Sequence, residues 1–273
     1  MAQNVYQRRV DDKVLTSSNP ADVWEDWKGD KESWLFLAPH DDDIILGGGL
    51  TFLASLSEGI PTYAAITTNG ESGYCYPEHK GKVAQIREAE ARASFAAMGL
   101  PEDHLFFLGY HDSGLDQFTG HFWTDDEQAP TTIAGATGLE NSYTWLLRKV
   151  RPTRVFFPSC TDIHPDHKIV GEELMISIFH ASGTIWPELG EPIESVPILY
   201  EYATYCDFLT PPNMRITVTP DLLEKKLAGI AAYKSQDQIG ELVELQRQAG
   251  CRECVRQIYF KLITPGKYNY LFD

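Results

Sequence analysis

Short apolar runs alternate with helix-like segments along the first 180 residues of the chain. Nearly continuous apolar runs of this length are typical of strands that are buried on both faces, as in a parallel sheet. Four such runs lie at 34–38, 62–67, 105–108 and 155–158. The segments that follow them predict helices at 44–57, 85–98, 139–150 and 168–179.

This alternation predicts an α/β fold with a Rossmann-like, mostly parallel sheet and helices on both faces. Later segments extend the pattern, with strands expected at 198–202 and 215–218 and a helix at 221–234. In such a sheet the active site forms at the C-terminal edge of the strands. We therefore expect the site where the first four strands end, in the polar segments 39–43, 67–73, 109–114 and 160–167.

The length of 273 residues accommodates one large α/β domain. Residues 1–32 are polar and precede the first predicted strand, so we interpret them as an N-terminal arm. The remainder, 33–273, is predicted to form a single α/β domain. Gly47, Gly48 and Gly49 lack the spacing of a nucleotide-binding loop, and we interpret them as a close approach of a helix to the sheet.

Composition narrows the range of partners. The formal net charge of −16 repels phosphate backbones and anionic lipid headgroups, so neither nucleic acid nor a membrane is an expected partner. No run approaches the ~20 apolar residues of a membrane span, and the polar first residues do not resemble a secretory signal. Five cysteines do not make a disulfide framework in a chain of this length. These features predict a cytoplasmic protein.

A cluster of acidic residues follows a histidine directly after the first predicted strand. Three adjacent aspartates, Asp41, Asp42 and Asp43, are electrostatically costly unless a cation compensates them. Where the chain turns into a helix, His40 and Asp43 point the same way, and Asp42 points elsewhere. The cluster thus offers two metal ligands and one free carboxylate. Helix capping is the alternative interpretation of the same acids.

A second cluster, residues 162–167, lies where the fourth predicted strand ends. A histidine from this cluster is able to close the site around a metal ion. Two histidines and one aspartate with an open position for water are typical of catalytic zinc, which lowers the pKa of water toward ~7. Asp42 would then accept a proton, and His164 would stabilise an oxyanion or protonate a leaving amine.

With both clusters in view, the chain resembles the PIG-L/LmbE-type zinc deacetylases, which act on N-acetylglucosaminyl and related substrates. Their first motif, A-H-P-D-D-E or P-H-P-D-D-E, matches residues 39–44, and their H-P-D-H motif matches 164–167. The resemblance implies that His40, Asp43 and His167 are the zinc ligands. It also implies that Asp42 is the general base, that His164 is the acid or oxyanion partner, and that Asp166 orients His164.

Weaker matches lie between the two motifs. Arg87 belongs to a segment that resembles the family's R-x-x-E helix, and Asp112 to one that resembles its L-G-Y-x-D loop, which implies that both residues contact the sugar. Two positions depart from the family. Asp41 replaces a proline and Ile44 replaces a glutamate that supports the metal ligands in relatives. Neither position is a metal ligand in the family, so metal binding is expected to persist.

The resemblance therefore implies a metal-dependent hydrolase that removes the acetyl group from an N-acetylated amino sugar or glycoside. Its cofactor would be Zn²⁺, with another divalent metal left open, and its partner a small amino-sugar substrate. Two alternatives remain: a hydrolase of another acylated amide, such as an antibiotic or amino acid, and a sugar-binding relative without catalysis. A homo-oligomer also remains open, because several soluble relatives form trimers or hexamers.

Overall fold

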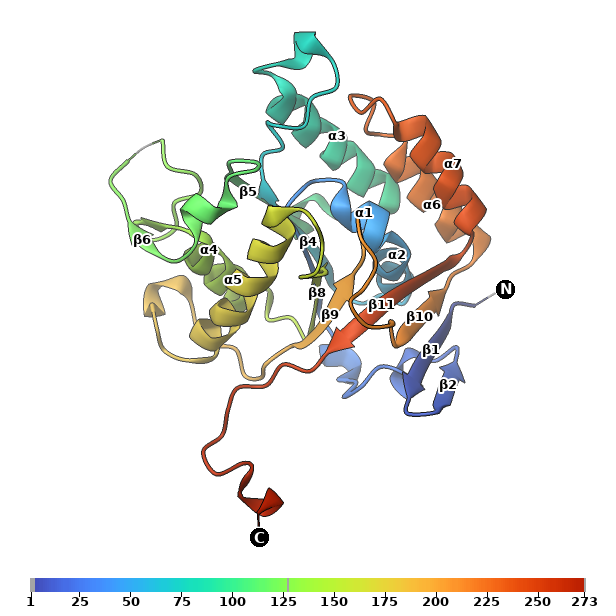
Figure 1. The fold of residues 1–273 in the computed structure, drawn as a ribbon, viewed down its shortest axis with the longest axis vertical. Helices are drawn as coiled ribbons and strands as arrows, with labels where there is room; N and C mark the ends of the chain where they lie inside the picture. The colour runs from blue at the N-terminus through green and yellow to red at the C-terminus, as the bar shows by residue number, and fades with distance from the viewer. Residues whose placement is uncertain (1–2, 127, 273) are drawn as a thin grey trace.

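A nine-stranded sheet forms the centre of the protein in a computed structural model that describes residues 3–126 and 128–272 (Figure 1). The first two residues of the predicted arm and the last residue of the predicted domain lie outside this description. Across the sheet the strands run in the order β2 (Lys13–Ser17), β1 (Val5–Val10), β10 (Met214–Thr217), β11 (Arg252–Ile258), β9 (Ile198–Tyr202), β8 (Arg154–Pro158), β3 (Trp34–Ala38), β4 (Thr62–Thr68) and β5 (Leu105–Tyr110).

The sheet has a parallel half and an antiparallel half. The strands from β9 through β8, β3 and β4 to β5 pair in parallel, whereas β2, β1, β10, β11 and β9 pair with antiparallel neighbours. The predicted α/β fold class is confirmed, and the sheet is mixed rather than parallel throughout. All four predicted buried strands belong to the parallel half, whose C-terminal edge was expected to carry the site.

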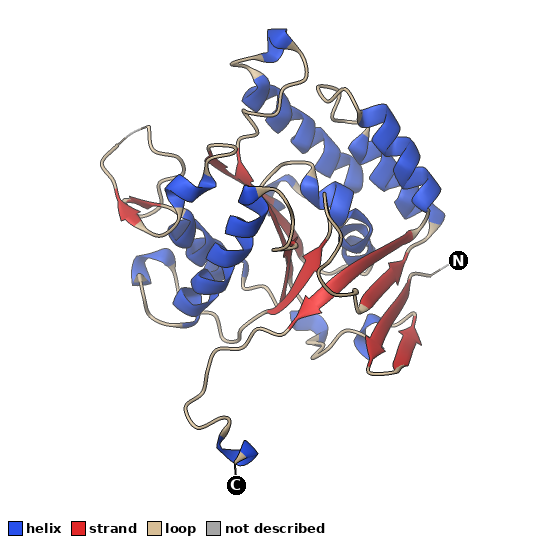
Figure 2. Ribbon diagram, in the orientation of Figure 1, coloured by secondary structure: helices blue, strands red, loops and turns tan. Residues whose placement is uncertain are grey.

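Helices cover both faces of the sheet (Figure 2). One face is covered by α1 (Asp43–Gly47), α2 (Gly49–Ser57), α3 (Val83–Met98), α6 (Pro220–Ile230) and α7 (Ile239–Ala249), and the other by α4 (Leu139–Val150) and α5 (Pro165–Ser182). The alternation of side chains along β3 explains the two layers. Phe36 belongs to the core cluster under α2 and α3, whereas Leu35 and Leu37 belong to the one under α4 and α5.

Two predicted helices differ from the structure in ways that matter for the site. The helix expected at 44–57 is interrupted at Gly48, so that it forms α1 and α2. The helix expected to begin at 168 begins at Pro165, because proline suits the first helical position and His164 accepts a hydrogen bond from the Asp166 amide as the cap. His167 therefore projects from the first turn of α5.

The antiparallel half of the sheet is built by segments at both ends of the sequence. The predicted N-terminal arm, 1–32, contributes β1 and β2, which join the sheet through the pairing of β1 with β10. The strand β11, which fills the gap between β9 and β10, was not predicted. A small hairpin, β6 (Phe122–Trp123) and β7 (Ala136–Thr137), stands apart from the main sheet. Among the described helices, none combines the length and apolar character of a membrane span.

Replacing Gly47 by alanine is expected to destabilise the fold. A Cβ atom at this position would lie 2.6 Å from the Ala203 carbonyl oxygen and 2.6 Å from Cδ2 of Tyr202, which confirms the predicted close packing. Because a shift is forced, we expect the free energy of unfolding to fall by about 1–3 kcal/mol. Thermal unfolding measures the change. Gly240→Ala in α7 is the control, since no atom lies within 4 Å of its Cβ position; equal melting temperatures for the two variants would contradict the packing argument.

Candidate active site

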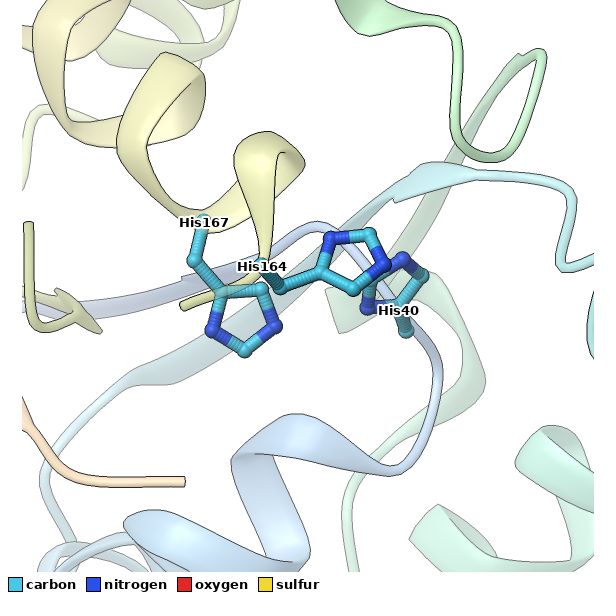
Figure 3. Close-up of side chains that lie close together, drawn as sticks. All are labelled: His40, His164 and His167. Carbon is cyan, nitrogen blue, oxygen red and sulfur yellow. The ribbon is translucent and has the colours of Figure 1, made fainter. Parts of the chain in front are cut away.

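Three histidines, one from the turn after β3 and two from the start of α5, converge at the C-terminal edge of the parallel strands (Figure 3). His40 lies in the turn between β3 and α1, and His164 and His167 lie at the start of α5, which follows β8. Each of the three offers a ring nitrogen within 4.8 Å of the others. The turn after β3 is fixed because the Thr68 hydroxyl donates a hydrogen bond of 2.8 Å to the Pro39 carbonyl. Parallel pairing of β3 with β8 thus brings together motifs that are far apart in the sequence.

Asp43 lies at the centre of this group. Its Oδ2 accepts a hydrogen bond of 2.9 Å from the backbone N–H of His40 and lies 3.1 Å from His40 Nδ1. The same oxygen lies 3.3 Å from Nε2 of His167. Asp43 and His167 are completely buried, and His40 is nearly so. The three predicted metal ligands are therefore brought together around one carboxylate oxygen.

The donor atoms of this group fit a divalent metal ion. Among the described residues, Oδ1 of Asp43 and both ring nitrogens of His167 have no hydrogen-bond partner, although they are buried. Leaving such an atom unpaired costs about 1–3 kcal/mol, which coordination to a cation would remove. Imidazole nitrogen and carboxylate oxygen are donors that suit zinc and similar ions. Within the described part of the chain, the groupings whose donor atoms all lie within 4.8 Å of one another are His40 with His164 and His167, and His40 with Asp112 and Asp166; neither includes Asp43. The predicted choice of three ligands stays a prediction.

The charges around His40 favour a cation at this position. Burial opposes protonation of His40, but the carboxylates of Asp43, Asp112 and Asp166 together raise its pKa well above the ordinary value. Burial likewise opposes ionisation of Asp43, yet His167 and His40 outweigh it and lower the pKa of that carboxyl. A metal ion bound here competes with the proton on His40, because an imidazole must be neutral to coordinate.

His167 is supported by two residues to which the sequence assigned no role. Oδ2 of Asp162 lies 3.3 Å from Nδ1 of His167 and accepts a hydrogen bond of 3.1 Å from the backbone N–H of Tyr205. The ring of Tyr205 stacks on His167 with the ring centroids 5.1 Å apart. The contact with Nδ1 is not a hydrogen bond by geometry, but a carboxylate beside the second nitrogen of a ligating histidine restrains the orientation of the ring. Asp162 thereby leaves Nε2 of His167 directed toward Asp43.

His164 is oriented by the backbone of its own helix. Its Nδ1 accepts a hydrogen bond of 3.2 Å from the N–H of Asp166, which leaves Nε2 as the protonated nitrogen. Burial and the charge of His40 lower the pKa of His164, so the ring is neutral near pH 7. The carboxylate of Asp166 contacts other groups: Oδ2 accepts a hydrogen bond of 2.9 Å from the Ser113 N–H and lies 3.6 Å from His40 Nε2. The backbone amide of Asp166, and not its carboxylate, contacts His164, and the orienting role of Asp166 stays a prediction.

Asp42 is free of the helix cap that was the alternative interpretation. It occupies the N-cap position of α1, but its side chain makes no capping hydrogen bond. Its side chain is 15% exposed, and Oδ2 lies 3.2 Å from Nη2 of Arg87. Arg87 also donates from Nε to both carboxylate oxygens of Asp41, at 3.0 and 2.9 Å. Asp42 therefore presents a carboxylate beside the predicted metal ligands, held on one side by a guanidinium.

A cavity of about 190 Å³ opens over these groups. Asp112 stands on its wall, where its carboxylate accepts a hydrogen bond of 3.1 Å from the Ser72 N–H and lies 3.2 Å from His40 Nε2. Burial opposes ionisation of Asp112, but His40 outweighs it and lowers the pKa. The lining combines predicted site residues with polar residues from three further loops: His40, Asp42, Gly70, Ser72, Gly73, Arg87, Asp112, Ser113, His164, Tyr205, Gln236 and Gln238.

Sequence comparison assigns a family to the part of the chain that carries the site. The family model described as PIG-L, GlcNAc-PI de-N-acetylase, matches residues 35–178, more than half of the chain. A probable N-acetyl-alpha-D-glucosaminyl L-malate deacetylase 2 from Bacillus cereus is 23% identical over 217 residues, which cover 75% of this chain and 83% of the relative. A 1D-myo-inositol 2-acetamido-2-deoxy-alpha-D-glucopyranoside deacetylase from Kineococcus radiotolerans is 29% identical over 164 residues, covering 55% and 45%.

Solved structures share the fold. The N,N'-diacetylchitobiose deacetylase from Pyrococcus horikoshii is 25% identical with a TM-score of 0.67, and the match covers 87% of this chain and 88% of that one. A 4-carboxy-2-hydroxymuconate hydratase from Pseudomonas putida is 16% identical with a TM-score of 0.61, covering 85% and 98%. Because the same fold carries a hydratase, the fold alone does not assign the reaction, and the argument for function must come from the site and the family.

Proposed function

The chain belongs to the PIG-L family of GlcNAc-PI de-N-acetylases, and from that premise we propose that it is a zinc-dependent hydrolase that removes the acetyl group from an N-acetylated amino sugar. One observation carries the proposal. His40 and His167 converge on the buried carboxylate of Asp43, and the carboxylate of Asp42, which makes no helix-capping hydrogen bond, stands beside them in contact with Arg87. The family and the sugar-directed names of the curated relatives support the choice of an acetamido sugar.

In this proposal His40, Asp43 and His167 would hold the zinc ion. A zinc ion supplies Lewis acidity there, which makes water a better nucleophile near neutral pH and polarises an acyl carbonyl. Asp43 and His167 carry buried polar atoms that have no hydrogen-bond partner among the described residues, and these two side chains would gain a partner from the ion. Asp162 and Tyr205 keep the His167 ring in place, so that binding requires little reorganisation.

Asp42 and His164 carry out the proton transfer and the hydrogen bonding of the reaction. Asp42 accepts the proton of the attacking water as a general base, since its carboxylate borders the cavity and Arg87 restricts its orientation. His164 is neutral and directs Nε2–H into the cavity, where it donates a hydrogen bond to the developing oxyanion. Asp42 then returns its proton to the departing amine, and acetate and a free amino sugar leave.

Loss and recovery of activity with metal tests the proposal. Protein stripped with a chelator is expected to lose most of its acetate release from N-acetylglucosaminides, and added Zn²⁺ is expected to restore it. Acetate is measured by an enzyme-coupled assay, and metal content by elemental analysis. A panel of N-acetylated amino acids run in parallel separates an amino-sugar hydrolase from a general amide hydrolase. Full activity of protein shown to be free of metal would contradict the zinc mechanism.

A further inference from the structure

Arg87 is the one arginine or lysine among the described residues that line the cavity, and its charge is already engaged. Its Nε and Nη2 both contact the carboxylate of Asp41, and Nη2 lies 3.2 Å from Oδ2 of Asp42. Arg87 is 5% exposed and Asp41 4% exposed, so water screens the pair weakly. One guanidinium is thus shared between two carboxylates that belong to the protein.

The partner of Arg87 is itself held in place. The Tyr233 hydroxyl donates a hydrogen bond of 2.5 Å to the backbone carbonyl of Asp41, and the Arg87 guanidinium lies 5.6 Å from the centroid of the Tyr233 ring. A substrate anion near Arg87 would meet a guanidinium whose charge Asp41 and Asp42 already offset, and turning Arg87 away from Asp41 to face the anion would strand a buried carboxylate. Breaking a buried ion pair in this way is strongly unfavourable. The guanidinium remains able to donate hydrogen bonds to uncharged hydroxyl groups.

The rest of the site offers an anion little compensation. The site holds six carboxylates, from Asp41, Asp42, Asp43, Asp112, Asp162 and Asp166, against one guanidinium. A divalent ion offsets two of these negative charges. The outer wall adds uncharged donors and acceptors from Ser72, Tyr205, Gln236 and Gln238. Such a wall recognises hydroxyl and amide groups by hydrogen bonding and disfavours a further negative charge.

From this arrangement we propose that the ion pair of Asp41 with Arg87 makes Asp41 a specificity-determining residue. It neutralises the one guanidinium or ammonium group that the described lining offers to an anion, so the site takes amino-sugar amides whose remainder is uncharged or cationic and rejects those that carry a carboxylate or phosphate. The inference rests on the proposed function and names the substrate class of the same site. Asp41 acts through Arg87 and does not touch the reacting atoms.

Two nearly isosteric substrates test the selectivity. Zinc-loaded protein is assayed with the 2-hydroxyethyl and the carboxymethyl glycosides of N-acetylglucosamine, which differ in charge but little in shape. At low ionic strength we expect kcat/KM to favour the uncharged glycoside by about tenfold. Added salt is expected to narrow the ratio, because it screens the repulsion. A ratio within about twofold of unity, or one that favours the carboxymethyl glycoside, would overturn the proposal.

Variants assign the selectivity to Asp41. Asp41→Asn frees the charge of Arg87, and we expect the preference to shrink at least about fivefold, chiefly through a lower KM for the carboxymethyl glycoside. The double variant Asp41→Asn/Arg87→Gln removes both charges and is expected to keep the ratio of the parent. Glu88→Gln, which removes an exposed acid next to Arg87 in α3, is the matched control and is expected to leave the ratio unchanged. Equal ratios for Asp41→Asn and Glu88→Gln would overturn the role of Asp41.

Failure of the two proposals can be told apart. If zinc-loaded protein releases acetate from neither glycoside, the proposed function fails. The selectivity is then tested by calorimetry, and the ratio of the two dissociation constants takes the place of the ratio of kcat/KM values. If Asp41→Asn does not fold, as judged by circular dichroism, the double variant replaces it. The double variant has no free guanidinium. If it nevertheless loses the preference for the uncharged glycoside as far as is expected for Asp41→Asn, the assignment of the selectivity to Asp41 and Arg87 would be overturned.

Discussion

Zinc binding and acetate release are both expected to disappear when His167 is replaced by alanine. His167 is completely buried, its Nε2 lies 3.3 Å from the Asp43 carboxylate, and its two ring nitrogens have no hydrogen-bond partner among the described residues. Removal of a group that merely supports a ligand costs roughly 10–100-fold in metal affinity, so loss of a ligand itself is expected to cost more. We expect kcat/KM to fall by about 10³-fold or more, since the Lewis acid is lost with the ligand.

Two measurements separate loss of metal from loss of fold. Zinc content after dialysis is measured by elemental analysis, and the fold is checked by circular dichroism and thermal unfolding. His104→Ala is a matched control, because His104 directly precedes β5 and so lies at the opposite edge of the parallel strands. It is expected to keep both zinc and activity. A folded His167→Ala variant that retains one zinc per chain and its turnover would exclude His167 as a ligand.

The parallel half of the fold could be predicted from the sequence because its strands are buried on both faces. The runs at 34–38 and 198–202 coincide with β3 and β9, and 139–150 coincides with α4. The antiparallel half gave a weaker signal. In β1 only Tyr6 is buried, and β2 is largely exposed. In β11 only two positions are buried, and the others are half-buried or exposed. Strands of this kind depend on pairing with distant segments, which a local pattern does not contain.

The helix boundaries near the site depended on contacts that the sequence pattern does not show. Periodicity predicted a continuous helix through Gly48, whereas the approach of Gly47 to Tyr202 and Ala203 accompanies a break there. The start of α5 was predicted three residues late, although Pro165 is a strong signal for a first helical position. That earlier start is what places His167 on the first turn, facing Asp43.

The candidate site was predicted in part for a related reason. His40, Asp43, His164 and His167 follow two of the strands that the pattern identified, so their meeting at one sheet edge could be anticipated. Tyr205 could not, because β9 was predicted as a strand but not as a parallel neighbour of β8. The loop that follows β9 and carries Tyr205 reaches the same edge of the sheet, which was not predicted. Gln236 and Gln238 precede α7, and only tertiary packing brings them to the cavity.

Asp41 departs from the family motif, and its ion pair with Arg87 changes the role that can be expected of Arg87. The resemblance implied that Arg87 contacts the sugar, and its place on the cavity wall is compatible with that role. The structure adds that the carboxylate of Asp41 accepts hydrogen bonds from both Nε and Nη2 of Arg87. A contact of Arg87 with substrate would then be a hydrogen bond from a neutralised group, and its contribution to binding would depend little on salt.

Replacing Asp42 by asparagine is expected to remove turnover while leaving the metal in place. Asparagine has the shape of aspartate but does not accept a proton, so the general base is lost and the site keeps its form. Loss of a positioned general base typically lowers the rate by about 10²–10⁴-fold, which corresponds to roughly 3–5 kcal/mol of activation free energy. We expect this loss in kcat with a small change in KM, because Asp42 acts mainly on the attacking water.

The control for Asp42→Asn removes a charge from the same neighbourhood without touching the chemistry. Asp237 lies between Gln236 and Gln238 of the cavity wall, and its carboxylate accepts a hydrogen bond of 3.2 Å from the Tyr76 hydroxyl. Asp237→Asn is expected to keep kcat within about twofold of the parent, as an exposed charge is well screened. Zinc content should match the parent in both variants. Asp42→Asn protein that turns over at the rate of the Asp237→Asn control would show that another group takes the proton, and His164 would be the next residue to replace.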